Sequence, residues 1–293
     1  MNIFERNILG IYGEFGKIWL KDLPQIIAKY SNTWNLTNLE PVKNLSYNYV
    51  LSGLQNGNDV ILKLSPDSNA LLREKIALGV FQGHGGVEII SYTDDALLLK
   101  RVMPGYSLQK NFPSDDEECI KIACDVMSRL HQSMSLISDF PDLRSLFKTL
   151  DKDLGIEDRY LLKARQLRDK LLAMSVEQVF LHGDLHQDNI LKDAEGWSAI
   201  DPKGIIGDPV YEATAFIRNP ITELAATPNA SDIIARRIVQ CSEYFDISPF
   251  YLTEWCFCQS VLSLAWCLED NTEAAHDVKM VEIMYNITHP ILK

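Results

Sequence analysis

Residues 179–211 constrain the fold of this chain more than any other stretch, because they place residues suited to metal and proton chemistry at informative spacings. Asp184 is followed five positions later by Asn189, and Asp201 comes twelve positions after that. The pattern between Asn189 and Asp201 predicts two short strands joined by a turn at residues 194–196. Such a hairpin returns Asp201 to the loop that it left. The sequence therefore predicts that the three side chains meet at one site.

The types of these residues indicate phosphoryl transfer. In protein kinases, an Asp followed five positions later by Asn supplies a proton acceptor and a magnesium ligand. The reaction mainly requires Mg²⁺ on the phosphates and an aligned hydroxyl nucleophile. Mg²⁺ prefers oxygen ligands, which Asn189 and Asp201 supply, and Asp184 is left free as the base. The alternative is that both aspartates are ordinary turn residues and that Asn189 caps a loop.

Two runs of sequence in this stretch resemble the aminoglycoside phosphotransferase family. They are His182-Gly183-Asp184-Leu185-His186 with Asn189, and Ile200-Asp201-Pro202-Lys203-Gly204 leading to Gly207-Asp208-Pro209. The Asp-Pro-Lys-Gly continuation is similar to the branch called streptomycin 6-phosphotransferase, or aminoglycoside/hydroxyurea resistance kinase. The dense match covers about 33 residues (179–211). The rest of the chain matches by the order of its predicted elements.

The resemblance and this order predict an α+β fold with two lobes, like that of protein kinases. A length of 293 residues also favours two lobes. We expect residues 1–103 to form a nucleotide-binding lobe, with two N-terminal helices within 3–34, a five-stranded antiparallel sheet and one further helix. The second of those N-terminal helices is predicted to start at Asp22-Leu23-Pro24. Residues 104–293 are expected to form a mostly helical catalytic and substrate-binding lobe.

A lysine and a glutamate in the first lobe are predicted to hold the nucleotide. Lys63 is the only charged residue in a predicted strand over 60–64, and Glu74 follows eleven residues later on a predicted helix over 68–81. In kinases a lysine at this place contacts the α- and β-phosphates and pairs with a glutamate on the next helix. The alternative for Lys63 is an exposed lysine on an edge strand.

Two further segments are predicted to contact the nucleotide. Residues 44–48 take the place of the kinase Gly-rich loop but contain no glycine, so Ser46 and Asn48 are the candidates for phosphate contacts. The Pro-Gly pair after Met103 resembles the hinge between the lobes, and the backbone from Arg101 to Met103 is expected to receive adenine.

The second lobe is predicted to be helical around the acceptor. Ser114 and Glu117 have the spacing of a capping box, and Asp208-Pro209 reads as a helix start. Possible contacts to the substrate or the transferring phosphoryl group are Lys203, His186, Glu223, Glu269 and Asp270. His182 and His186 are expected to brace the loop, although a metal site built from His182, Asp184 and His186 is an alternative.

Composition limits the partners and the compartment. The net charge of -12 and pI near 5.0 argue against nucleic acid and would attract a polycationic substrate. Six cysteines without a Cys-x-x-Cys pair read as buried free thiols in a reducing cytoplasm. The N-terminus is not typical of a signal peptide, and the most apolar segment, residues 249–268, contains Glu254 and fits a buried helix better than a membrane span.

The sequence thus predicts a kinase that uses ATP, with GTP as the alternative donor, together with Mg²⁺. The acceptor implied by the resemblance is a hydroxyl of an aminoglycoside of the streptomycin type, in the context of antibiotic resistance. One alternative is a kinase of a hydroxylated metabolite, such as a sugar or a choline-like alcohol. The other is a nucleotide-binding regulator without turnover.

Overall fold

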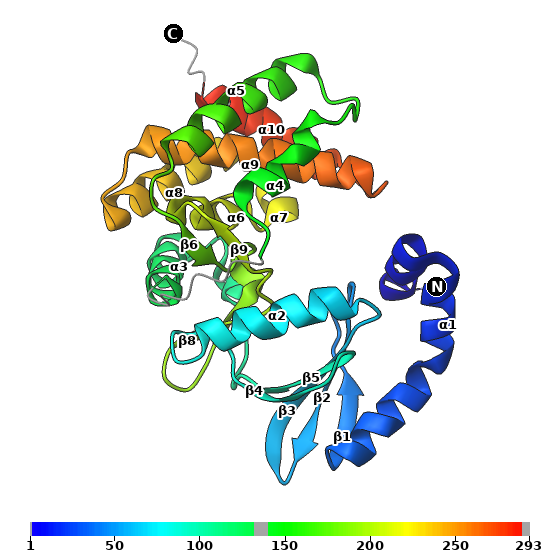
Figure 1. The fold of residues 1–293 in the computed structure, drawn as a ribbon. Coiled ribbons are helices and arrows are strands. Elements are labelled where there is room, and N and C mark those ends of the chain that lie inside the picture. Colours follow the sequence, from blue (N-terminus) through cyan, green and yellow to red (C-terminus); the bar gives the residue numbers. More distant parts are fainter. Residues whose placement is uncertain (1, 132–139, 289–293) are drawn as a thin grey trace.

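The computed structural model describes residues 2–131 and 140–288, which form two lobes (Figure 1). The α-helices are α1 (Ile3–Thr33), α2 (Ser68–Phe81), α3 (Asp116–Leu130), α4 (Leu143–Leu146), α5 (Asp158–Met174), α6 (Glu212–Arg218), α7 (Ile221–Ala226), α8 (Ala230–Phe245), α9 (Pro249–Glu269) and α10 (Ala275–Thr288). The strands are β1 (Leu36–Pro41), β2 (Tyr49–Gln55), β3 (Asn58–Leu64), β4 (Ile89–Tyr92), β5 (Ala96–Lys100), β6 (Val179–Leu181), β7 (Ile190–Lys192), β8 (Trp197–Ala199) and β9 (Ile205–Gly207). The 3₁₀ turns among the described residues are η1 (Leu108–Asn111), η2 (Phe147–Asp151), η3 (Gln187–Asn189) and η4 (Pro209–Tyr211).

The first lobe is built on an antiparallel sheet of five strands in the order β1-β2-β3-β5-β4, which confirms the predicted sheet and the α+β class. Side chains alternate between the two faces along a strand. On β5, Leu98 packs with the residues that α1 buries, whereas Leu97 and Leu99 pack with α2. Figure 1 shows the consequence: α1 runs along one side of the sheet, and α2 lies between the sheet and the second lobe.

The N-terminal helices break at a different place from the one predicted. The helix runs through Pro24, so the expected start at residues 22–24 is wrong, and the chain instead bends at Gly13, which has φ 53° and ψ -128°. A positive φ favours glycine, which has no Cβ. Helix continues past Pro24 because its apolar side remains buried against the sheet at Leu23 and Tyr30.

The second lobe is helical and is organised around α9. Twelve residues of α9 are buried, and α5, α6, α8 and α10 all contact this helix. The chain crosses from α5 to α6 through the segment that carries the predicted catalytic residues. Within this segment β6 pairs with β9, and β7 pairs with β8 in the predicted hairpin.

The start of α3 corrects another prediction. The helix begins at Asp116, and its N-cap residue Asp115 makes no side-chain cap hydrogen bond, so the capping box of Ser114 and Glu117 is wrong. The N–H of Asp115 donates instead to the carbonyl of Asn111 at 2.9 Å. Asp116 turns inward, is 3% exposed, and pairs with arginines of α8.

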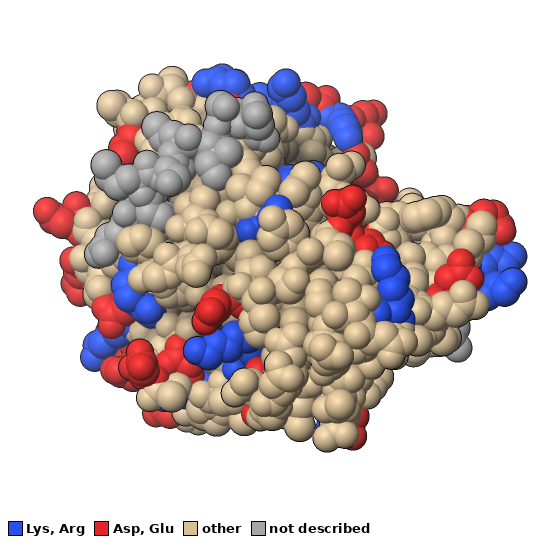
Figure 2. Space-filling view, turned by 60° about the horizontal axis from the view of Figure 1, so that its bottom comes forward, with Lys and Arg blue, Asp and Glu red and all other residues tan. Residues whose placement is uncertain are grey.

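Other features of the described residues bear on the predicted class. The six cysteines are free thiols, and five of them are buried. Within residues 2–131 and 140–288, no helix is both long enough and apolar enough to cross a bilayer. On the face seen in Figure 2, acidic and basic side chains are interspersed and do not gather into one large patch of a single sign.

Candidate active site

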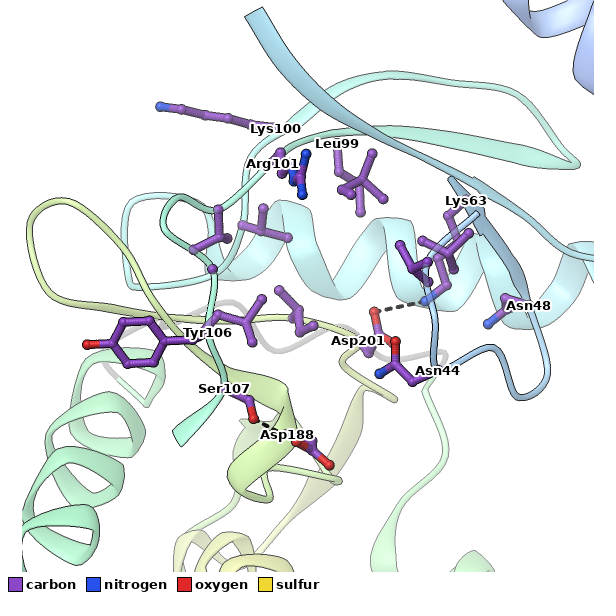
Figure 3. A pocket seen from close by; sticks show the side chains of 18 of the residues that line it. Asn44, Asn48, Lys63, Leu99, Lys100, Arg101, Tyr106, Ser107, Asp188 and Asp201 are labelled. Carbon is purple, nitrogen blue, oxygen red and sulfur yellow. Dashed lines mark hydrogen bonds and ion pairs between the residues drawn. The ribbon is translucent and has the colours of Figure 1, made fainter. Parts of the chain in front are cut away.

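A cavity of about 410 Å³ lies between the sheet and the second lobe (Figure 3). Apolar side chains from both lobes line most of it: Val42, Val50, Ile61, Val87, Leu99, Leu191 and Ile200. Its polar end carries Lys63 and Asp201, and Ser107 donates to Asp188 at 2.8 Å on the side of the second lobe. An apolar cavity with charged groups at its polar end has the chemistry to hold a nucleotide base and its phosphates.

Lys63, Glu74 and Asp201 form a cluster at that polar end. The Lys63 ammonium contacts Glu74 at 2.7 Å and Asp201 at 3.0 Å, and Lys63 is 3% exposed. Burial acts to lower the pKa of Lys63, but Asp201 and Glu74 outweigh it and raise that pKa above its usual value. Lys63 is therefore held as a cation in the wall of the cavity.

Asp201 reaches this cluster because of the hairpin and an unusual backbone conformation. The N–H of Ile200 donates to the carbonyl of Asn189 at 3.0 Å, which closes the hairpin. Asp201 then adopts a positive φ of 59°, an uncommon conformation outside glycine that is found at functional sites. Desolvation acts to raise the pKa of Asp201, but Lys63 holds it below its usual range, so the residue is a carboxylate.

Asp184 lies on the open side of the site. Its side chain is 31% exposed, with Lys203 Nζ at 3.9 Å and His186 Nε2 at 4.0 Å from its carboxylate oxygens. Asn189 Nδ2 donates to the backbone carbonyl of Asp184 at 2.9 Å. The carboxylate thus stays accessible, while the backbone beneath it is tied to Asn189.

Gly183 and His182 shape the turn before Asp184. Gly183 has φ 81°, and a Cβ there would meet the side chain of Ile205 at 2.4 Å, so only glycine fits. His182 is fully buried; its Nε2 contacts the carbonyl of Ile200 at 2.8 Å, and its Nδ1 accepts from the Asp184 N–H at 3.3 Å. Burial lowers the pKa of His182 below its usual value, so the neutral ring braces the loop.

Glu212 is a positioning residue that sequence reasoning missed. Its buried carboxylate accepts from the backbone N–H groups of His182 at 2.6 Å and Gly183 at 2.9 Å, and His131 Nε2 lies 3.7 Å away. Burial acts to raise the pKa of Glu212, but His131, His182 and the backbone donors together lower it below its usual value. A glutamate at the start of the apolar run Ala213 to Ile217 was the available signal.

The loop of residues 44–48 does line the cavity, with both Ser46 and Asn48 among its walls. The N-terminal helix supports it from outside, because Asn7 Nδ2 donates to the carbonyl of Ser46 at 3.1 Å. A hydrogen bond from a neighbouring helix thus holds this glycine-free loop.

The two predicted hinge residues lie in different surroundings. Arg101 lines the cavity, and its guanidinium lies 3.4 Å from Asp59. Met103 is 46% exposed, and the cavity walls include its neighbours Val102 and Pro104 rather than Met103 itself. At the predicted hinge the cavity is therefore lined by Arg101, Val102 and Pro104 rather than by Met103.

The predicted acidic contacts lie away from the cavity walls. Glu223 accepts from Gln109 Nε2 at 3.1 Å, Glu269 forms an ion pair with Lys152, and Asp270 directly follows α9. Among the described residues, no group of three or more His, Cys, Asp or Glu side chains is placed to hold a metal ion. Because His182 faces the protein interior, the alternative metal site with Asp184 and His186 receives no support from this geometry.

Comparison with known proteins identifies the family. The sequence model of the aminoglycoside/hydroxyurea antibiotic resistance kinases matches residues 34–271. The chain belongs to this family. That membership confirms the resemblance predicted from the Asp-Pro-Lys-Gly run and makes the protein a kinase of the phosphotransferase class.

Relatives of this kinase include proteins named for streptomycin. Streptomycin 6-kinase of Streptomyces griseus is 24% identical over 277 residues, which cover 89% of this chain and 88% of the relative. Streptomycin 3''-kinase of Klebsiella pneumoniae is 30% identical over 234 residues, covering 76% of this chain and 85% of the relative.

Solved structures confirm the predicted fold of this resistance kinase. The choline kinase LicA from Streptococcus pneumoniae has a TM-score of 0.67 at 14% identity, covering 90% of this chain and 98% of that one. A thermostable mutant of aminoglycoside phosphotransferase APH(4)-Ia, in a ternary complex with ADP and hygromycin B, has a TM-score of 0.64 at 14% identity, covering 88% and 97%. At this identity the likeness concerns the fold.

Proposed function

We propose that this protein is an ATP- and Mg²⁺-dependent kinase that phosphorylates a hydroxyl group of an aminoglycoside of the streptomycin type. The observation that carries the proposal is that Lys63 and Asp201 line the polar end of one cavity, while the hairpin ties Asp201 to Asn189, and Asn189 in turn holds the backbone of Asp184. The streptomycin kinases among its relatives supply the acceptor class.

Asp184 is proposed to orient the acceptor hydroxyl and to accept its proton. Its carboxylate is partly exposed on the open side of the site, where a bound hydroxyl can reach it. Lys203 lies 3.9 Å away and is 63% exposed, so its cation is available to the transferring phosphoryl group. His186, at 4.0 Å from Asp184, limits where the carboxylate can move.

The side-chain oxygens of Asn189 and Asp201 fit Mg²⁺. Asn189 uses its Nδ2 for Asp184, which leaves its side-chain oxygen for a metal, and Asp201 is a carboxylate held by Lys63 through one oxygen. Hard oxygen ligands from one amide and one carboxylate suit Mg²⁺ bound with phosphates. When bound, the metal would neutralise charge on the phosphate oxygens.

Nucleotide binding is assigned to the first lobe and the hinge, and we place the boundary between the lobes at residues 103 and 104. Lys63, braced by Glu74, is proposed to hold the α- and β-phosphates. Ser46 and Asn48 then lie over the phosphates, and the backbone near Arg101 receives the base.

The acceptor is proposed to bind beyond Asp184 as seen from the cavity. The net negative charge of the protein would attract a polycationic acceptor. Glu223 and Asp270 remain the candidates for contacts to its cationic groups. Glu269 already pairs with Lys152, so a substrate cation would have to displace that lysine.

The test is consumption of ATP or GTP by purified protein with Mg²⁺ across streptomycin, other aminoglycosides, hydroxyurea, choline and simple sugars, with Asp184→Asn as the control. Streptomycin-dependent turnover that the control lacks is the expected result. Turnover with a metabolite alone would retain the kinase and overturn the aminoglycoside. Nucleotide binding without turnover on any acceptor would indicate a regulator.

A further inference from the structure

The catalytic loop, residues 182–189, is held at both of its ends by the short helix α6. At the first end, Glu212 accepts from the N–H groups of His182 and Gly183. At the second end, Gln187 Nε2 donates to the carbonyl of Phe216 at 3.1 Å and to that of Asn219 at 2.5 Å. Helix α6 and the residue that follows it therefore hold the catalytic loop in place at both of its ends.

Gln187 points away from the cavity and into the second lobe. It is 1% exposed, and within the described part of the chain its side-chain oxygen has no hydrogen-bond partner. The side chain is thus anchored through its nitrogen alone. Gln187 opens the 3₁₀ turn η3 that ends at Asn189, so a shift of the anchor moves the proposed metal ligand two residues later.

The carbonyls that anchor Gln187 are shared with a buried arginine of α8. Arg237 is fully buried, and its Nη1 donates to Asn219 at 2.5 Å, Ile217 at 2.9 Å and Phe216 at 3.3 Å. Its other nitrogens bind the carboxylate of Asp116 on α3, with Nη2 at 2.5 Å. A planar guanidinium reaches all of these acceptors at once, which a single ammonium does not.

We propose that Arg237 and Gln187 are positioning residues for the phosphoryl-transfer site: Arg237, neutralised by Asp116, fixes the last carbonyls of α6, and through them Gln187 sets the place of Asn189. The proposal rests on the proposed function for its kinetic consequence, because Asn189 matters there as a metal ligand. Its structural part, the control of the loop by Arg237, stands independently of any substrate.

The contacts of Asn189 explain why a small displacement would matter. Its N–H donates to the carbonyl of His186 at 2.9 Å, and its Nδ2 donates to the carbonyl of Asp184. A shift of η3 therefore moves the proposed metal ligand and the proposed base together. Loss of partners that orient a metal ligand typically costs about 10- to 100-fold in metal affinity or activity.

The chain offers a matched control beside Arg237. Arg236 also binds Asp116, with Nη2 at 3.0 Å, but it is 40% exposed at its side chain and is not among the donors to the α6 carbonyls. Arg237→Lys keeps the positive charge and loses the planar guanidinium with its several donors. Arg236→Lys makes the same change one residue earlier. Gln187→Met removes the donor that anchors the loop and changes no charge.

The experiment measures backbone hydrogen exchange of residues 185–190 in ligand-free protein, and the Mg²⁺ concentration that gives half-maximal kcat. Arg237→Lys and Gln187→Met should speed exchange in this segment and raise the Mg²⁺ requirement by about 10-fold, while Arg236→Lys changes neither. A role in folding alone would lower the melting temperature of Arg237→Lys and leave both readouts unchanged, which would overturn the proposal. Equal effects of both lysine variants would overturn it as well.

Two arms keep this test separate from that of the proposed function. If the unmodified protein turns over no acceptor, the proposed function fails, and hydrogen exchange alone then decides whether Arg237 controls the loop. If Arg237→Lys does not fold, Gln187→Met decides, because it leaves the buried ion pair in place. Unchanged exchange in Gln187→Met would then refute the anchor.

Discussion

The two sides of the site differ in how firmly their charged groups are held. On the nucleotide side, Lys63 is 3% exposed and contacts two carboxylates within 3.0 Å. On the acceptor side, Lys203 is 63% exposed and lies 3.9 Å from Asp184. The lysine proposed to hold the phosphates is thus fixed by its contacts, whereas the lysine proposed to face the acceptor retains freedom.

The largest effect is expected from the acceptor side of the comparison. Asp184→Asn should lower kcat by about 100- to 10⁴-fold, because it removes the proposed proton acceptor. Nucleotide affinity, measured by calorimetry with Mg²⁺ and a non-hydrolysable ATP analogue, should change by less than about 2-fold, since Asp184 is not among the cavity walls. Asp201→Ala should lower both kcat and nucleotide affinity. Equal loss of nucleotide binding in the two variants would contradict this division of roles.

The nucleotide side is tested by Lys63→Met, which keeps the length of the side chain and removes its charge. We expect nucleotide affinity to fall by about 10- to 100-fold, because a buried, hydrogen-bonded cation is lost from the proposed phosphate site. Acceptor KM at saturating nucleotide should stay within about 2-fold, since the Lys63 ammonium contacts Glu74 and Asp201 and is assigned to the phosphates. A rise in acceptor KM without a loss of nucleotide affinity would contradict the assignment of Lys63 to the phosphates.

Lys203→Met is the matched variant on the acceptor side. Its exposed ammonium is only loosely held near Asp184, so we expect kcat to fall by about 10-fold and nucleotide affinity to remain unchanged. Steady-state kinetics with each substrate varied in turn will separate the two effects. Nucleotide affinity that falls as far as in Lys63→Met would show that the two lysines act on the same phosphates.

The smallest effect concerns pH and the buried His182. Burial lowers the pKa of His182 in the folded state, so the unfolded state binds more protons below about pH 6.5 and stability is lost as the pH falls. The slope contributed by this residue is at most about 1.4 kcal/mol per pH unit. Urea unfolding at several pH values should show a weaker acid dependence in His182→Asn than in the original chain. An identical dependence would mean that His182 takes up a proton as readily in the folded state as in the unfolded state.

Much of this site could be predicted because its residues are ordered along the chain as the chemistry requires. The spacing of Asp184, Asn189 and Asp201 encodes a local loop and hairpin, and a lysine on a strand followed by a glutamate on a helix encodes a local pair. Short-range geometry of this kind is visible in a sequence.

The supporting residues could not be predicted in the same way. Asp116, Gln187 and Arg237 are charged or polar, and such residues are mostly exposed in proteins. Their burial depends on contacts between α3, α6, α8 and the catalytic loop, and Arg237 lies 121 positions from its partner Asp116. The bend at Gly13 was missed for a related reason, because the packing of α1 on the sheet, and not local propensity, decides where that helix continues.

The packing of α1 also shows that the region matched by sequence similarity is shorter than the region that packs as one unit. The segment that similarity assigns to the resistance kinase family begins at residue 34, yet Phe4, Ile8, Trp19, Leu23 and Tyr30 of the preceding helix are buried against the first sheet. At the other end, Met280, Val281 and Met284 of α10 lie in the core beyond residue 271. A clone cut at the borders of the family match would therefore leave two apolar surfaces open to aggregation. Expression of a stable protein therefore requires α1 and α10 in addition to the residues that the family match covers.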